Sequence, residues 1–222
     1  MTAVTPSDRR AQPALYVATM PLDVDESRLA ILEAARRLLA EEGAGALTVR
    51  RIVAESGGST MNVYSRFGGK NGVVQALFIE GFARLTALMA TSAQTEDPLV
   101  DLYRCAMLYR RFALENRTYY GVMFEGAVPD LVSTNETKAA AMGALGMLAA
   151  AAQRTIDAGA LVHENAQSLA ADLWATFHGI VSLELRPMGP PDCDWPARYS
   201  ETTAALLRGF TPIGMSAGPH PD

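Results

Sequence analysis

The chain has 222 residues, a formal net charge of −5 and a composition that is 49% hydrophobic but only 7% aromatic. This length fits one large domain or two small ones, and an Ala- and Leu-rich composition without convincing period-2 runs favours helices over strands. The two cysteines, Cys105 and Cys193, match no metal-ligand spacing and indicate reduced thiols in a cytoplasmic protein.

Residues 1–24 are rich in Thr, Pro and Ala and lack a helical stripe, so we expect a disordered arm there. Arg9 and Arg10 offer this arm two charges for a DNA phosphate, although a tail without a function is the simpler interpretation. The first helix is then expected from Asp25 or Ser27, as its cap, to Glu42-Gly43. Its buried face consists of Leu32, Ala35, Leu38 and Leu39.

Residues 48–70 carry the clearest pattern in the chain, two short helices around a glycine turn. Thr48 is suited to cap the first of them, and its apolar stripe is formed by Val49, Ile52 and Val53. Gly57-Gly58 ends that helix, and Ser59 is suited to cap the second. The second helix turns Val63 and Phe67 inward and leaves a polar or basic set outside: Thr60, Asn62, Tyr64, Ser65 and Arg66. The pattern predicts a helix-turn-helix whose second helix enters the DNA major groove.

Helix-turn-helix geometry also occurs in proteins that never touch DNA, and the local charge is what favours DNA. Residues 28–84 hold eight Lys or Arg against five Glu, within a chain that is acidic overall. Past Lys70 a longer helix is expected to about Thr91. Lys70 comes just before its first turn, where amide hydrogens and the helix dipole favour an anion such as a DNA phosphate. The plain alternative for Lys70 is a solvated lysine.

Five further helices are expected in the C-terminal half. Their ranges are about 98–116, 118–126, 138–159, 167–186 and 196–209. Pro187 and the residues after it should end the fourth of these helices, because proline cannot continue a helix. Residues 211–222 look like a disordered tail.

The N-terminal half resembles the DNA-binding domain of the tetracycline-repressor (TetR) family of bacterial regulators. The matching segments are ILEAARRLLAEEG, LTVRRIVAESG and VYSRFGGK. The resemblance implies a DNA-binding domain over residues 25–85, with base-reading positions at Thr60, Met61 and Asn62. It also implies phosphate contacts at Thr48, Arg50, Tyr64 and Lys70, to which we add Arg66 from the same basic face. The chain departs from the family pattern at Gly58, Met61 and Gly68, which leaves the operator sequence open.

The C-terminal half resembles the TetR-type C-terminal domain that is named for its Trp-His-Gly signature. The signature residues are Trp174, His178 and Gly179, and the segment ENRTYYGVMFEG is similar to the upstream part of that domain. The resemblance implies a ligand-binding and dimerisation domain over residues 86–210, whose last two helices pair with those of a partner. We therefore expect an all-α protein of about nine helices, a three-helix DNA-binding head followed by this helical domain.

Aromatic, methionine and histidine side chains of the second half are candidates for a ligand pocket, because such pockets are apolar with few polar groups. The candidates are Tyr103, Met107, Phe112, Tyr120, Met123, Phe124, Trp174 and His178. A plain hydrophobic core uses the same residue types, so both interpretations stay open.

No pattern points to an enzyme. His163, His178 and His220 belong to no catalytic motif, and there is no phosphate loop or dinucleotide fingerprint, so we expect no catalytic residue, cofactor or metal. We find no apolar run of membrane-spanning length and no signal peptide, and we expect no membrane partner. The sequence thus predicts a one-component transcription regulator, a repressor that binds a palindromic operator in double-stranded DNA as a homodimer. An unknown apolar small-molecule effector would release it. The alternative is a helical ligand-binding or scaffold protein with a vestigial DNA head.

Overall fold

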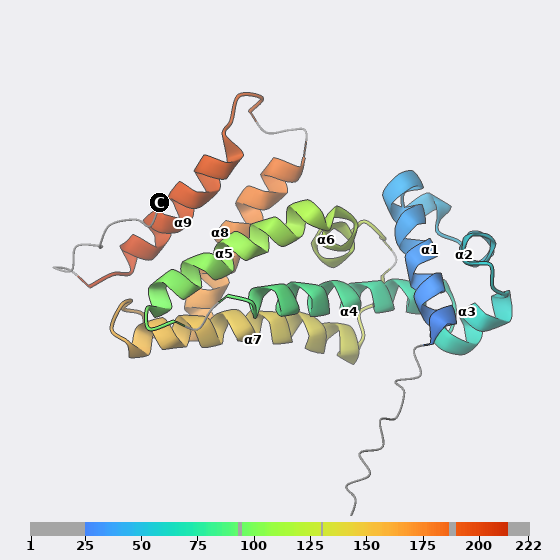
Figure 1. Cartoon of the computed structure of the whole chain (residues 1–222), viewed down its shortest axis with the longest axis horizontal. Coiled ribbons are helices and arrows are strands. Elements are labelled where there is room, and N and C mark those ends of the chain that lie inside the picture. The colour runs from blue at the N-terminus through green and yellow to red at the C-terminus, as the bar shows by residue number, and fades with distance from the viewer. Residues whose placement is uncertain (1–24, 93–94, 130, 187–189, 213–222) are drawn as a thin grey trace, which may run out of the picture.

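A computed structural model describes residues 25–92, 95–129, 131–186 and 190–212. In these ranges the chain forms nine α-helices, one short 3₁₀ helix and no strand (Figure 1), which confirms the all-α class. The elements are α1 (Glu26–Glu42), η1 (Ala44–Ala46), α2 (Val49–Ser56), α3 (Thr60–Phe67), α4 (Lys70–Met89), α5 (Pro98–Glu115), α6 (Arg117–Phe124), α7 (Asn135–Asp157), α8 (Ala166–Leu185) and α9 (Trp195–Gly209). The expected arm 1–24, with Arg9 and Arg10, lies outside the described residues, as do Pro187 and residues 213–222 of the expected tail.

The helices form a small head and a larger body that share one long helix. Helices α1, α2 and α3 gather at one end of the molecule, whereas α8 and α9 lie toward the opposite end (Figure 1). Helix α4 contacts α1 and α3 in the head and α5, α6 and α7 in the body. It therefore runs across the expected domain boundary at residues 85 and 86.

Helix α4 also corrects one expectation from the sequence. Among the described residues it is the one helix that is long and apolar enough, by length and composition alone, to cross a membrane. Its apolar side chains pack in the protein core, where Val73, Val74, Leu77 and Leu85 are buried against neighbouring helices. This is the pattern of a central core helix.

Local signals set the helix starts. The Asp25 carboxylate accepts the amide hydrogen of Arg28 (N–O 3.0 Å) at the start of α1, and Asp97 caps α5 ahead of Pro98. Helix α7 begins three residues earlier than expected, because Thr134 and Thr137 form a reciprocal capping box.

One hydrophobic cluster extends from Ile31 in α1 to Leu207 in α9. Polar contacts also join its helices inside the body, including the following two. The Arg110 guanidinium of α5 donates to the Glu184 carboxylate of α8 (Nε–Oε2 2.8 Å), and the two side chains are only 19% and 11% exposed. The Tyr199 hydroxyl of α9 donates to the backbone carbonyl of Ala106 in α5 (2.6 Å). The core therefore fixes α5, α8 and α9 as one packed unit.

Candidate functional site

Helix α3 presents a largely uncovered outer face. The Ser59 hydroxyl accepts the amide hydrogen of Asn62 (3.2 Å) and so caps the helix, while Val63 is fully buried against the head. On the outer side Met61 is 72% exposed and Tyr64 57% exposed, and Thr60 is exposed as well. Met61 and Tyr64 are three residues apart and therefore lie next to each other on the helix surface, where the described part of the chain leaves both side chains uncovered.

The turns on both sides of α3 depend on left-handed glycines. Gly57 ends α2 with φ +70°, and Gly68 ends α3 with the same φ. Gly69, with φ +117°, then leads into α4. Residues with a Cβ atom adopt these conformations at a cost, which explains the spacing of glycines around the helix-turn-helix. At the other end of α2, the Thr48 hydroxyl accepts the amide hydrogen of Arg51 (3.2 Å) and caps the helix.

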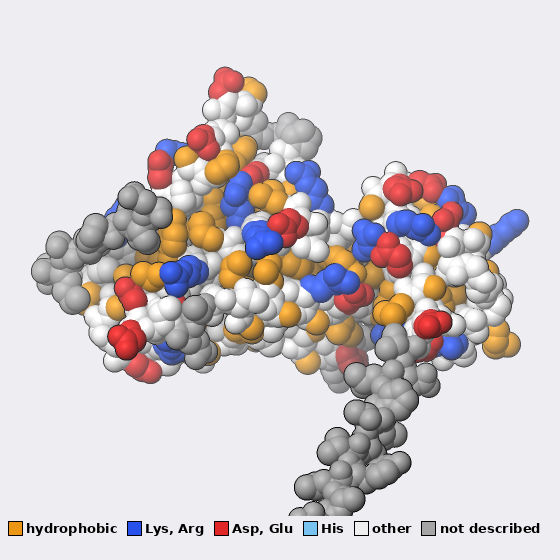
Figure 2. Space-filling view, in the orientation of Figure 1, with side chains coloured by type: hydrophobic (Ala, Val, Ile, Leu, Met, Phe, Trp, Pro, Cys, Tyr) orange, Lys and Arg blue, Asp and Glu red, His pale blue; other side chains and the backbone are white. Residues whose placement is uncertain are grey.

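Most basic side chains of the head are already paired with acids. Five of the eight Lys and Arg residues between 28 and 84 form ion pairs: Arg36 with Glu33, Arg37 with Glu55, Arg51 with Glu42, Arg66 with Asp25 and Arg84 with Glu80. Basic and acidic side chains are accordingly interspersed on the head (Figure 2). Arg50 and Lys70 form no ion pair within the parts of the chain that the structure describes. Arg28, the third cation without an ion pair, lies over the Phe67 ring instead, 4.7 Å from the ring centroid. Arg50 and Lys70 are therefore the two cations of the described head that are available to an external anion.

Arg66 has a contact that the sequence pattern does not reveal. Its Nε lies 2.7 Å from Oδ2 of Asp25, the cap of α1, and its Nη1 lies 3.5 Å from the side-chain oxygen of Asn62. The hydrogen bond from Arg66 lowers the pKa of the Asp25 carboxyl, so the pair is ionic near neutral pH. Arg66 thus ties α3 to the start of α1, in addition to lying on the outer face.

Lys70 is the first residue of α4 rather than the residue before it. Gly69 is the N-cap and supplies no side-chain hydrogen bond, so the first-turn amide hydrogens lack a side-chain acceptor. Next to them, Lys70 is half-buried. Orphan amides, the helix dipole and a lysine together make an anion-attracting position beside α3.

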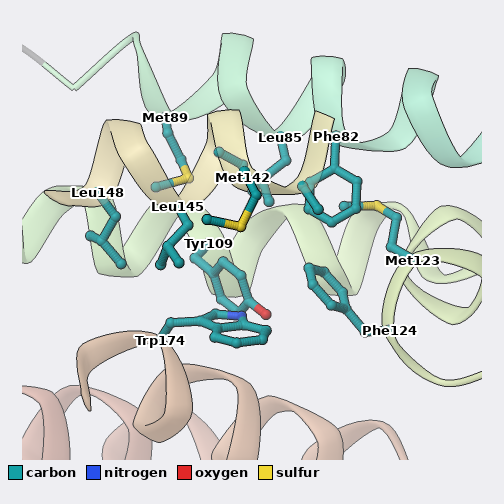
Figure 3. Close-up of a pocket in the computed structure, with 12 residues that line it drawn as sticks. Phe82, Leu85, Met89, Tyr109, Met123, Phe124, Met142, Leu145, Leu148 and Trp174 are labelled. Carbon is teal, nitrogen blue, oxygen red and sulfur yellow. The ribbon is translucent and has the colours of Figure 1, made fainter. Parts of the chain in front are cut away.

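A cavity of about 240 Å³ lies in the body between α4, α5, α6, α7 and α8 (Figure 3). From α4 to α6, the lining side chains are Phe82, Leu85, Met89, Tyr109, Met123 and Phe124. From α7 and α8, they are Ala141, Met142, Ala144, Leu145, Leu148 and Trp174.

Three of the eight pocket candidates from the sequence are in this wall, namely Met123, Phe124 and Trp174. The other five do not line it. At 100° per residue, Tyr103 and Met107 lie on a different side of α5 from Tyr109, and Phe112 is buried in the core around the cavity. Tyr120 and His178 lie behind the wall. The wall itself includes eight side chains from α4 and α7 that were not among the candidates from the sequence, such as Leu85 and Leu148.

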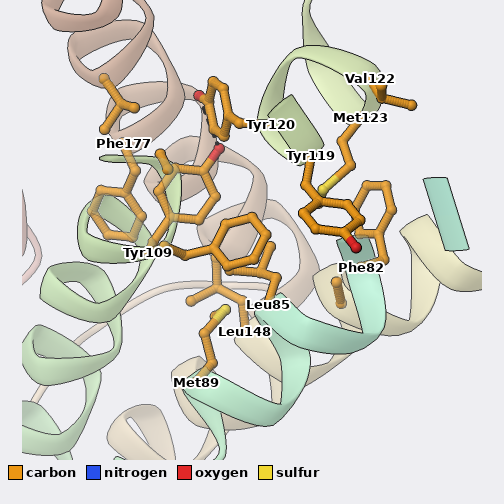
Figure 4. Packing of buried hydrophobic residues seen from close by; sticks show 14 of the residues in the cluster. Phe82, Leu85, Met89, Tyr109, Tyr119, Tyr120, Val122, Met123, Leu148 and Phe177 are labelled. Carbon is orange, nitrogen blue, oxygen red and sulfur yellow. Dashed lines mark hydrogen bonds between the residues drawn. The ribbon is translucent and has the colours of Figure 1, made fainter. Parts of the chain in front are cut away.

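A hydrogen-bonded chain stands behind the aromatic wall. The Tyr109 and Tyr120 hydroxyls point toward one another (Figure 4), with 3.3 Å between their oxygens. The Tyr120 hydroxyl lies 2.7 Å from Nδ1 of His178, and Nε2 of His178 lies 3.5 Å from the Ser182 hydroxyl. Burial lowers the pKa of His178, with a smaller contribution from Arg186 that also lowers it and one from Glu125 that opposes it. Burial also raises the pKa of Tyr120. The chain is therefore neutral near pH 7.

Both halves of the chain match known protein families. Residues 31–77 match the family described as bacterial regulatory proteins, tetR family, and residues 102–208 match the tetracyclin repressor-like C-terminal domain. Among curated proteins, none matches the chain by sequence.

Solved structures share the fold. A protein of unknown function from Rhodococcus sp. RHA1 is 22% identical, with 86% of this chain and 99% of that chain covered and a TM-score of 0.75. The TetR family transcriptional regulator PfmR from Thermus thermophilus is 22% identical, with 80% and 97% covered and a TM-score of 0.64. A putative tetR family transcription regulator from Shewanella sp. PV-4 is 18% identical, with 82% and 95% covered and a TM-score of 0.64. Together the two family matches span most of the chain, and the protein therefore belongs to the tetR family of transcriptional regulators.

Proposed function

We propose that this regulator is a dimeric repressor, which binds a palindromic operator through α3 and leaves it when an apolar small molecule fills the cavity. The observation that carries the proposal is the course of α4. Its first turn lies against α3, and three of its side chains, Phe82, Leu85 and Met89, belong to the cavity wall. A single rigid element thus touches both the DNA-facing helix and the ligand site.

In the proposed complex the outer face of α3 enters the major groove. Thr60, Met61 and Asn62 lie on its first turn and would approach base edges, where an Asn amide pairs well with adenine and an apolar side chain with the thymine methyl group. Arg50, Lys70 and the exposed hydroxyls of Thr48 and Tyr64 would hold phosphates on either side.

The proposed dimer forms through α8 and α9. The outer side of α8 is exposed and carries small residues at a four-residue spacing, Ala171, Ala175 and Gly179, followed by Leu183, which is 52% exposed. On α9, Ala205 is exposed as well. Small residues let two helices approach closely, and covering Leu183 adds the apolar burial that association needs. A two-fold axis there would present two recognition helices to two half-sites.

Release by a ligand requires two states with different ligand affinities. A molecule between α4, α7 and α8 would favour the arrangement of α4 that gives the cavity the most room, and the first turn of α4 would move with it. The ligand shifts the population only if this arrangement fits DNA less well than the other, which is the thermodynamic requirement for the mechanism.

The test is selection of DNA by the full-length protein from a random duplex library at two salt concentrations. We expect enrichment of a palindrome with half-sites about one helical turn apart or a multiple of it, and an affinity that falls steeply as salt rises. Absence of any enriched sequence at low salt would contradict the proposal and favour a scaffold protein with a vestigial head.

A further inference from the structure

The cavity wall contains almost no polar atoms. Ten of its twelve side chains are hydrocarbon or thioether groups, and the two exceptions are Tyr109, with a hydroxyl, and Trp174, with an indole N–H. No lining side chain carries a charge. An ionised group placed in such a cavity would lose its hydration without gaining a partner, which strongly disfavours its binding. The wall chemistry therefore selects neutral molecules.

The size of the cavity limits the occupant to one or two rings. A dry apolar cavity of about 150 Å³ accepts benzene, whereas pockets for drug-sized ligands start near about 300 Å³. At about 240 Å³ this cavity falls between the two. Phe82, Phe124 and Trp174 offer ring edges and faces, and the three methionines in the wall offer sulfur atoms and flexible chains. Both kinds of side chain pack favourably against an aromatic ring.

The Tyr109 hydroxyl supplies the polar end of the site. It lies at the wall end of the chain that continues through Tyr120 to His178. If His178 accepts at Nδ1, the hydrogens of Tyr120 and Tyr109 both point inward along the chain, and Tyr109 offers an oxygen lone pair. In the other His178 tautomer the order reverses, and Tyr109 is free to donate. A ligand hydroxyl matches both arrangements, because it donates and accepts.

We propose that the cavity binds a neutral one- or two-ring aromatic molecule that bears one hydroxyl group, with the ring among Phe82, Phe124 and Trp174 and the hydroxyl on Tyr109. That such a ligand acts as the effector rests on the proposed function, whereas its binding does not. Tyr120 is a positioning residue, since it orients the Tyr109 hydroxyl without being in the wall. Met142 of α7 lines the cavity and is also 62% exposed, so the cavity wall reaches the protein surface at this residue.

The test compares three probes of nearly equal shape by calorimetric titration of the full-length protein at pH 7.5. The probes are 4-propylphenol, 4-propylanisole, which lacks the hydroxyl hydrogen, and 4-propylbenzoate, which is charged. We expect the phenol to bind about 3- to 10-fold more tightly than the anisole, the usual net value of one hydrogen bond. We expect the benzoate to bind at least about 100-fold more weakly than the phenol. Benzoate binding as tight as phenol binding, or no binding of any probe, would overturn the proposal.

Variants locate the hydroxyl contact. Tyr109→Phe should reduce the affinity for the phenol to that for the anisole while leaving the anisole affinity nearly unchanged, and Tyr120→Phe should reduce the difference in part. Tyr103→Phe removes a hydroxyl from the same helix away from the cavity and should keep the full difference. A phenol preference that survives Tyr109→Phe would contradict the assignment. Retained anisole binding shows that each variant is folded.

The regulatory role is scored separately, by operator affinity with and without 4-propylphenol. A probe that binds without changing operator affinity would refute release through this cavity and leave the ligand chemistry intact. Conversely, release by 4-propylbenzoate but not by the phenol would leave the regulator intact and overturn the ligand class.

Discussion

A Cβ atom at Gly72 would lie 1.6 Å from the carbonyl oxygen of Phe67, so the first turn of α4 is packed directly onto the last residue of α3. Any side chain at this position forces the two helices apart, because the obstacle is backbone. We therefore expect Gly72→Ala to lower operator affinity by about 10-fold or more, since about 1.4 kcal/mol of misplacement already accounts for a factor of ten. Circular dichroism melting with DNA-binding isotherms would check it.

Gly146→Ala is the matched control for Gly72→Ala. Gly146 is exposed within α7 and has no atom within 4 Å of a built Cβ. There the substitution should stabilise the protein by about 0.5–1 kcal/mol through helix propensity and leave DNA binding unchanged. Equal effects of the two substitutions on operator affinity would show that the α3–α4 contact is not what positions α3.

Lys70→Ala should weaken binding to specific and random DNA alike and reduce the slope of log affinity against log salt by about 1, because one phosphate contact is lost. The reason is that Lys70 is unpaired among the described residues and stands beside uncapped amides. Arg84→Ala is the control, since Arg84 pairs with Glu80 on α4 away from α3. A salt slope that stays the same in Lys70→Ala would remove Lys70 from the phosphate contacts.

Asn62→Ala should instead relax base preference. The Asn62 side chain is on the first turn of α3 and makes one long contact to Arg66 inside the protein, so its hydrogen-bonding groups are available to a base edge. We expect a loss of about 1–3 kcal/mol on the preferred operator and little change on random DNA. Selection of the variant against the same random library would show the change as one degenerate position per half-site. Equal losses on both kinds of DNA would count against base reading.

Features fixed by neighbouring residues were predictable from the sequence. The caps Thr48 and Ser59 and the glycine exit at Gly57 depend on a few adjacent residues, and the helix ranges followed from such signals within about three residues. The Arg66–Asp25 pair was not predictable in this way, because its members are 41 residues apart and meet only when α3 docks on α1.

The residues that line the cavity were also not predictable from the sequence. A helical stripe identifies which residues are buried, but not which of them face a void. Leu148 and Phe177 are equally typical of a core, and only Leu148 lines the cavity, because that distinction depends on how five helices meet. Choosing residues by type therefore selected three wall positions and missed the nine others, which include Phe82, Met89 and Met142 as well as aliphatic side chains.

The buried Arg110–Glu184 pair should be important for stability. Glu184→Leu leaves a guanidinium without its partner in a site that is 19% exposed, and we expect a loss of about 3 kcal/mol in the free energy of unfolding. The double substitution Arg110→Met with Glu184→Leu removes both charges and should recover most of this loss. Urea unfolding of the two single variants and the double variant gives the coupling directly. Additive losses would show that the two side chains act independently.

The neutral state of His178 predicts a specific pH dependence of stability. Burial, followed by the charge of Arg186, lowers the pKa of His178 below its ordinary value of 6.5, and Glu125 offsets this in part. Below about pH 6.5 the unfolded chain therefore binds a proton that the folded protein still excludes, and the free energy of unfolding falls as the pH drops from 7 toward 5. In His178→Gln this part of the slope should disappear, because the group that takes up the proton on unfolding is gone.

His163→Gln removes a histidine that lies near Asp172 instead, and it serves as the control. Urea unfolding at several pH values between 5 and 7.5 measures the slope for each protein. A slope in His178→Gln equal to that of the unaltered protein would show that His178 is protonated in the folded state as readily as in the unfolded chain, and the hydroxyl chain could not then be neutral at pH 5.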